Sequence, residues 1–173
     1  NSSSSLVPLL GELEAVLARN YDAYEIIAIN DYSSDDTWQT LKNYQSSHPR
    51  LKLIDLAKNF GQHNATICGV REAKYEISVT LDDDGQNPPT EIPLLVDKLH
   101  SGYDIVYGIP QKSEHDSFKV FTSKLFRAAI SLVQVPQAEK IGSFRAFRTS
   151  LRDGFAETTG RSFCLDFLLF WST

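Results

Sequence analysis

The sequence predicts an α/β domain with a mostly parallel sheet and helices on both faces, and two observations carry that prediction. Helical and strand patterns alternate from the start through residue 107, which is the order of a sheet whose parallel strands are joined by helices. The strand segments are compact apolar runs, as in strands that are covered on both faces. A chain of 173 residues can form one domain with its own core, which we expect over 1–173.

Each expected element has a local signal. The helices have apolar residues at helical spacing and mostly follow residues that can cap a helix, namely the serine run, Asp35 or Asp36, and Thr90. These helices are expected over 6–17, 38–44, 65–73 and 91–99. Pro93 is tolerated in the first turn of the last one. The strands are expected over 24–29, 51–56, 77–81 and 104–107.

The two ends of the sequence depart from this scheme. Asn1 and the serine run lead directly into a helix, whereas an α/β domain of this kind usually begins with a strand. The other end, Leu168–Trp171, stops inside an apolar helical pattern. We therefore expect a single domain that lacks its first strand and is truncated at both ends relative to a longer protein.

Composition and charge narrow the class of protein. Residues 1–110 carry 16 acidic and 8 basic side chains, whereas residues 111–152 carry 8 basic and 3 acidic ones. The basic segment is short and has no nucleic-acid reader motif, so no nucleic-acid partner is expected. No apolar run approaches the roughly 20 residues of a membrane helix. Cys68 and Cys164 match no disulfide or zinc pattern and are expected to be buried and reduced, which favours a cytoplasmic protein.

Polar clusters follow expected strands at their carboxyl ends. Asn30-Asp31 follows the first strand, Lys58–Gly61 the second and Asp82–Gly85 the third. The carboxyl ends of parallel strands meet at one edge of a sheet, where such sheets bind ligands. The sequence therefore predicts a binding site at this edge, built by loops that are far apart in the chain.

The aspartate triplet at 82–84 is the most informative of these clusters. Adjacent carboxylates repel one another, and a divalent cation such as Mg²⁺ or Mn²⁺ relieves that repulsion and also binds phosphates. Side chains alternate in extended backbone, so Asp82 and Asp84 are expected to point the same way, and Asp83 elsewhere. The alternative is a hairpin turn at Asp84-Gly85, but residues 86–89 lead into a helix and not into a returning strand.

Four segments follow one another in the chain, namely Asn30–Thr37, Lys58–Gly61, Leu81–Pro89 and Gly142–Arg148. Together they resemble family 2 glycosyltransferases, most closely the polyprenyl-phosphate mannose and glucose synthase branch. Leu81–Pro89 resembles the family's D-x-D-x-Q-x-P-P segment, and Asn30–Thr37 its N-D-G-S-x-D-x-T loop. Lys58–Gly61 resembles the R-N-F-G loop, and Gly142–Arg148 the G-x-F-R-x-x-x-R segment. Each motif is weak alone, but the four occur in the family's order and cover nearly the whole chain.

The resemblance implies a GT-A type fold of nucleotide-diphospho-sugar transferases. It implies metal-dependent transfer of a sugar from a nucleotide-diphospho-sugar to a polyprenyl-phosphate or saccharide acceptor, with inversion at the sugar. By analogy, Asp82 and Asp84 hold the metal, and Asp31 meets the nucleobase. The residues implied in binding the nucleotide-sugar are Asp31, Ser33, Lys58, Asn59, Gly61, Asp82, Asp83 and Arg145.

Two positions depart from the family pattern. Tyr32 replaces the glycine of the N-D-G-S loop, which restricts the turn. Ser143 stands at a candidate catalytic position, where the polyprenyl-phosphate synthases usually carry an aspartate, and if that aspartate serves as a general base, this chain lacks it there. A lipid phosphate is already an anion near neutral pH and needs no base, whereas a hydroxyl acceptor needs one, which Asp166 could supply. Alternatively, Asp166 pairs with Arg161 or Arg145.

The basic segment and the two departures at Tyr32 and Ser143 each allow more than one interpretation. Apolar residues at helical spacing over 118–132 predict either a helix packed on the core or a surface that contacts anionic lipid, in which case the protein lies at the cytoplasmic face of a membrane. Ser143 and Tyr32 also allow a nucleotide-sugar-binding module with a scaffolding or regulatory role. A nucleotidyltransferase is disfavoured because no glycine-rich basic loop is visible. The sequence indicates no oligomeric state.

Overall fold

The computed structural model describes residues 1–108, 142–156 and 165–172. The helices are α1 Leu6–Asn20, α2 Thr37–Gln45, α3 Gln62–Glu72, α4 Ile92–His100 and α6 Leu165–Trp171, with 3-10 helices η1 Pro89–Glu91 and η3 Thr149–Phe155. The strands are β1 Ile26–Asn30, β2 Leu51–Asp55, β3 Ile77–Thr80, β4 Ile105–Tyr107 and β5 Arg145–Arg148. The alternation of helices and strands is therefore confirmed, and each expected strand exists.

The strands form two sheets. β1 and β2 pair in parallel, with Ile26 opposite Leu51. The second sheet has the order β3-β5-β4, in which β5 is antiparallel to both neighbours. We did not predict β5 from the sequence. It lies at the centre of this sheet, and its two middle residues, Ala146 and Phe147, have 0% exposure. The α/β class and a parallel sheet are confirmed, while β5 adds two antiparallel pairings at the centre of the second sheet.

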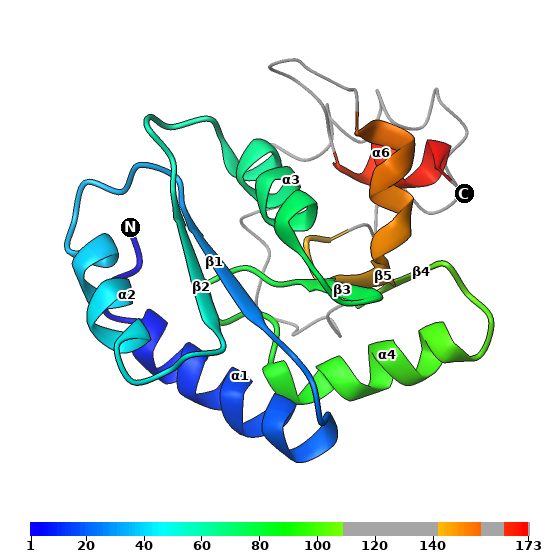
Figure 1. The fold of residues 1–173 in the computed structure, drawn as a ribbon, viewed down its shortest axis with the longest axis horizontal. Coiled ribbons are helices and arrows are strands. Elements are labelled where there is room, and N and C mark those ends of the chain that lie inside the picture. Colours follow the sequence, from blue (N-terminus) through cyan, green and yellow to red (C-terminus); the bar gives the residue numbers. More distant parts are fainter. Residues whose placement is uncertain (109–141, 157–164, 173) are drawn as a thin grey trace, which may run out of the picture.

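Helices cover both sides of the strands. Figure 1 shows α1 and α4 along one side and α3 along the other, with α6 beyond it. An apolar cluster joins α1, α2 and the β1–β2 sheet, and its buried members are Leu6, Leu10, Ile26, Leu41 and Leu51. A second cluster joins α4 to β5, and a third joins α3, η3 and α6. Burial of these apolar faces is what fixes the helices on the sheets.

β1 and β3 both line a cleft of ≈ 1960 Å³ along their whole length. Within the described residues, β1 pairs only with β2 and β3 only with β5, so the cleft separates the two sheets. Its volume exceeds the roughly 300–1,000 Å³ of a typical ligand pocket, because it extends from the polar loops into the apolar interior, where buried residues such as Leu10, Leu41 and Val96 line it. The cleft therefore brings together side chains from both sheets.

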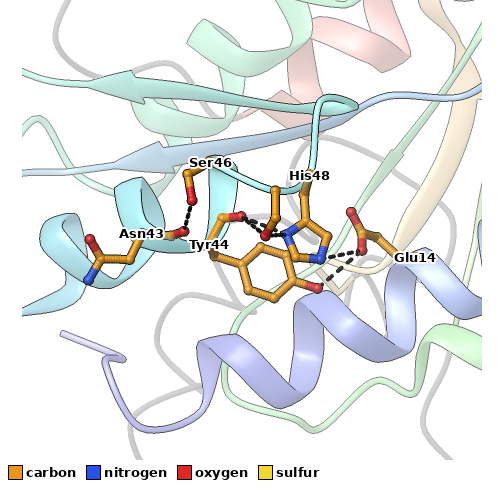
Figure 2. Close-up of polar contacts among 6 residues, drawn as sticks. Glu14, Asn43, Tyr44, Ser46 and His48 are labelled. Carbon is orange, nitrogen blue, oxygen red and sulfur yellow. Dashed lines mark hydrogen bonds and ion pairs between the residues drawn. The ribbon is translucent and has the colours of Figure 1, made fainter.

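A polar cluster at the far end of α2 ties that helix to α1 (Figure 2). The Tyr44 hydroxyl donates to Glu14 Oε2 at 3.2 Å, and Nε2 of His48 lies 3.3 Å from the same oxygen. The His48 ring stacks on the Tyr44 ring, with 3.7 Å between centroids. Burial and the bond to Glu14 raise the pKa of Tyr44. None of these side chains lines the large cleft, so we assign them a structural role.

Two expected helix caps differ in the structure. Asp36 occupies the N-cap position of α2 without a side-chain bond, while Asp35 Oδ1 accepts from the Thr37 amide at 3.1 Å. Hydrogen bonds, mainly with Thr37, lower the pKa of Asp35 to about 2. Thr90 lies inside η1 and does not cap α4, because the chain enters α4 through this 3-10 turn. Pro93 lies in the first turn of α4, as predicted.

The prediction that Cys68 is buried is wrong. Its side chain is half-buried and the thiol is free, and partial burial raises its pKa. Cys164 and the basic segment 118–132 lie outside the described residues. In the part of the chain that the structure describes, no helix has the length and apolarity needed to span a membrane.

Candidate functional site

The loop after β1 is held by Asn30, the last residue of that strand. Its side chain is 4% exposed and donates to Asp55 Oδ1 at 2.7 Å, while its Oδ1 accepts from the Ser33 amide at 3.3 Å. Tyr32 has φ +61°, and among the described residues it is the one non-glycine residue whose backbone is left-handed. The turn therefore keeps the shape that a glycine adopts readily, although a tyrosine occupies it.

Asp31 joins the loop after β1 to the loop after β2. Its Oδ1 accepts from the Phe60 amide at 2.7 Å, and its Oδ2 from the Gly61 amide at 2.8 Å. Gly61 has φ +85°, which lets its amide turn toward Asp31 at the start of α3. The structure thus shows Asp31 holding the second loop, and its expected contact with a nucleobase stays a prediction. Lys58 lies with Nζ 5.1 Å from the centroid of the Phe60 ring.

Asp82, in the loop that leaves β3, is held by two neutral side chains. Its Oδ1 accepts from Gln62 Nε2 at 2.6 Å, and its Oδ2 accepts from the Ser143 hydroxyl at 2.5 Å. Asp83 and Asp84 are exposed, and Asp84 Oδ1 accepts from the Gln86 amide at 3.0 Å. Gln62 is a site residue that we did not predict, although it directly follows the Lys58–Gly61 motif.

A buried ion pair lies next to this site. Arg145, on β5, is 2% exposed, and its guanidinium pairs with the Asp166 carboxylate of α6. Its Nε also donates to Thr80 Oγ1 at 3.2 Å, and that hydroxyl donates to the Ser143 carbonyl at 2.5 Å. The pairing of Asp166 with Arg145 is therefore observed, whereas Arg161 lies outside the described residues. The catalytic role of Asp166 stays a prediction.

One cleft brings most of the predicted site residues together. Those that line it are Asp31, Ser33, Asn59, Asp82, Asp83, Asp84, Ser143, Arg145 and Asp166, and Gln62 joins them. Lys58 and Gly61 do not line it. The loops of both sheets thus open onto the same space, as expected for the carboxyl ends of strands. Among the charged side chains of the described residues that line it, all are acidic except Arg145.

The described residues contain no cluster of three or more histidine, cysteine or acidic side chains that could hold a metal by itself. Asp82 and Asp84 offer two carboxylates, which are hard oxygen ligands. Mg²⁺ and similar cations are commonly held by one or two carboxylates together with substrate phosphates, and not by a complete protein cage. The residues present fit that mode of binding.

A family profile and curated relatives agree on what this chain is similar to. The profile described as Glycosyl transferase family 2 matches residues 8–165. The undecaprenyl-phosphate 4-deoxy-4-formamido-L-arabinose transferase of Klebsiella pneumoniae is 33% identical over 94% of this chain and 50% of its own length. An uncharacterized glycosyltransferase of Synechocystis sp. is 31% identical over 99% of this chain and 54% of its own. The chain thus spans about half the length of these relatives.

Solved structures share the fold. A mannosyltransferase from Pyrobaculum calidifontis, in complex with GDP-Man and Mn²⁺, matches with a TM-score of 0.62 and 18% identity, over 88% of this chain and 43% of its own. Glucosyl-3-phosphoglycerate synthase from Mycobacterium tuberculosis, with Mn²⁺, UDP-glucose and phosphoglyceric acid, also has a TM-score of 0.62, at 15% identity, over 89% and 55%. The expected GT-A fold is confirmed. With this fold, and with the family profile matching most of its length, the chain belongs to glycosyltransferase family 2.

Proposed function

We propose that this protein transfers a sugar from a nucleotide-diphospho-sugar to a polyprenyl phosphate, with a divalent cation and with inversion at the anomeric carbon. The observation that carries the proposal is the single cleft onto which Asp31, Ser33, Asp82 and Asp84 open, in a chain of family 2. The relatives named as undecaprenyl-phosphate sugar transferases support the acceptor class. The neighbours solved with Mn²⁺ and nucleotide-sugars support the donor and the cation.

Asp82 and Asp84 are the residues that would hold Mg²⁺ or Mn²⁺. When bound, the cation offsets the negative charge that develops on the departing diphosphate. Asp31, Ser33 and Asn59 lie on the two loops that Asp31 joins, and we assign them to the nucleotide, with Lys58 and Gly61 on the same loops. Asp83 and Arg145 complete the residues assigned to the donor.

The serine at position 143 favours a phosphate as the acceptor. Ser143 is not a base at neutral pH, and Asp166 is engaged by the Arg145 guanidinium. A phosphate monoester is already anionic near pH 7, so its oxygen can attack the anomeric carbon without losing a proton to the protein. The nucleoside diphosphate leaves as the new bond forms, and a single displacement of this kind inverts the sugar. A saccharide acceptor would require a base, for which Asp166 is the candidate.

A polyprenyl phosphate is a lipid, so the proposed reaction takes place at a membrane surface. A nucleotide-sugar donor would meet it at the cytoplasmic face. Co-sedimentation of the protein with vesicles that contain a polyprenyl phosphate, compared with vesicles that lack it, measures this contact.

Donor binding is tested by thermal unfolding of the purified protein with UDP-, GDP- and dTDP-sugars, each with and without Mn²⁺. We expect one class of nucleotide-sugar to raise the melting temperature, and to do so only with the cation, because a ligand that binds the folded state stabilises it. The proposal fails if none of these donors has an effect.

The metal ligands are tested by substitution. Asp82→Asn combined with Asp84→Asn should remove the Mn²⁺ dependence of donor binding, because an amide is a much weaker ligand for a hard cation than a carboxylate is. Asp97→Asn is the matched control, since this exposed carboxylate of α4 does not line the cleft and is assigned to neither the metal nor the donor. Equal loss in the control and in the double variant would contradict the assignment.

A second candidate is a nucleotide-sugar-binding module without turnover, with a scaffolding or regulatory role. The serine at position 143 favours it, because the carboxylate of the related synthases is absent there. Incubation with a radiolabelled nucleotide-sugar and a polyprenyl phosphate separates the two candidates. Labelled lipid supports the transferase, whereas donor binding with neither transfer nor slow hydrolysis supports the module.

A further inference from the structure

We propose that Gln62 and Ser143 are positioning residues that hold the Asp82 carboxylate in one orientation for a cation. This inference rests on the proposed function, because it concerns the carboxylate that we assign to the metal. It adds Gln62 to the site and gives Ser143 a role other than that of a base.

The geometry places one neutral donor on each oxygen of Asp82. Gln62 Nε2 donates to Oδ1 at 2.6 Å from the first residue of α3, and Ser143 Oγ donates to Oδ2 at 2.5 Å from the segment that leads into β5. The donors come from both flanks of the carboxylate and from distant parts of the chain, at separations of 20 and 61 residues. Together they restrict rotation of the carboxylate about its last side-chain torsion.

The chemistry of these donors leaves Asp82 able to bind a cation. A carboxylate has about four lone-pair sites, and the two hydrogen bonds use two of them. An amide and a hydroxyl carry no charge, so they orient the carboxylate without cancelling the charge that a cation requires. A lysine or arginine in either place would compete with the metal.

Ser143 is the more firmly held of the two donors. Its carbonyl accepts from Thr80 Oγ1 at 2.5 Å, and Thr80 in turn accepts from the buried Arg145. Gln62 makes its contact with Asp82 at the exposed start of α3. A donor whose own position is fixed by further hydrogen bonds orients a ligand better than a mobile one. We therefore expect a larger effect from loss of the Ser143 hydroxyl than from loss of the Gln62 amide.

Substitutions of Ser143 should change the affinity for Mn²⁺ in opposite directions. A carboxylate at position 143 would face the Asp82 carboxylate at hydrogen-bonding distance, where two like charges repel. A divalent cation between them would relieve that repulsion and gain a ligand. Ser143→Asp should therefore bind Mn²⁺ more tightly than the wild type and be less stable without it, whereas Ser143→Ala should bind Mn²⁺ more weakly.

The test is a titration of the purified protein with Mn²⁺ alone, followed by electron paramagnetic resonance of the free ion, which needs no activity. We expect Ser143→Ala to weaken Mn²⁺ binding by roughly 10-fold and Gln62→Ala by less, since loss of partners behind a metal ligand commonly costs 10–100-fold. Ser143→Thr keeps the hydroxyl and should restore binding. Gln39→Ala is the matched control, because Gln39 donates to Asn43 on exposed α2, away from the cleft.

The outcomes separate this inference from the proposed function. If the wild type binds Mn²⁺ and both alanine variants bind it equally well, the positioning role is overturned and the proposed function stands. If the wild type binds no Mn²⁺ alone, the titrations are repeated with UDP or GDP, whose phosphates would complete the metal shell. If the wild type binds no Mn²⁺ under these conditions either, the metal assignment fails and the inference fails with it. Should Ser143→Ala not fold, Gln62→Ala and the opposite shift in Ser143→Asp still decide the question.

Discussion

The loops of the two sheets hold their acidic residues in different ways. On the β1–β2 side, Asp31 is held by the backbone amides of Phe60 and Gly61. On the β3–β5 side, Asp82 is held by the side chains of Gln62 and Ser143, and a buried Arg145 stands next to them. A site held by backbone depends on the shape of a loop, whereas one held by side chains depends on residue identity. The two halves of the cleft should therefore respond differently to substitution.

The largest effect is expected at the buried ion pair of the second sheet. Asp166→Asn leaves the guanidinium of Arg145, whose side chain is 3% exposed, without its counter-charge. Removal of one partner of a buried pair typically costs about 3–5 kcal/mol of unfolding free energy. Urea denaturation measures this loss. Glu76→Gln, which breaks the exposed pair with Arg148, is the control and should cost under about 1 kcal/mol. Similar losses in both variants would mean that burial does not decide the strength of the Arg145 pair.

A smaller effect is expected from Asp31, in the first sheet. In Asp31→Asn only one side-chain oxygen remains to accept, so one of the two amide bonds is lost, at about 1.5–3 kcal/mol for a bond to a charged group. Hydrogen exchange should accelerate at the amides of Phe60 and Gly61 and remain unchanged in β5. Unchanged exchange at both amides would show that Asp31 does not hold the second loop.

A gain of stability is expected at Tyr32, in the same loop. A left-handed backbone at a non-glycine residue costs roughly 1–2 kcal/mol, and glycine removes that cost while adding flexibility to the unfolded chain. Tyr32→Gly should therefore stabilise the protein by up to about 1 kcal/mol in thermal unfolding. Tyr103→Gly, at an exposed position with ordinary backbone, should not stabilise it. A loss in Tyr32→Gly would indicate that the tyrosine ring contributes more than the strained turn costs.

The smallest effect is expected from acid titration of Asp35. Its folded pKa of about 2 lies below the ordinary value of 3.8, so the stabilisation from its ionised form is present above about pH 4 and is lost as pH falls through 2. The difference in stability between wild type and Asp35→Asn should therefore shrink as the solution is acidified over that range. NMR titration of the Asp35 carboxyl checks the cause, and an ordinary pKa there would refute it.

Local patterns were sufficient for much of the first sheet. The apolar runs around β1 and β2 and the polar residues after them predicted both strands and the loops that follow, because burial and turn chemistry act over a few neighbouring residues. The pattern around β5 was less informative. Arg145–Arg148 is short and has an arginine at each end of two apolar residues, and nothing local indicates that the strand would enter the sheet between β3 and β4.

The sequence by itself determined the α/β class, the family and the acidic loop after β3, because these depend on local periodicity and on motifs that are continuous in the chain. The tertiary structure alone decided which side chains meet. It joined Gln62 and Ser143 to Asp82, tied Asp31 to the amides of another loop, and placed Arg145 against Asp166, a pairing that the sequence offered only as one alternative. Contacts of this kind link residues about 20 to 60 positions apart, and they form only when the packing of helices on the two sheets brings those loops to one cleft.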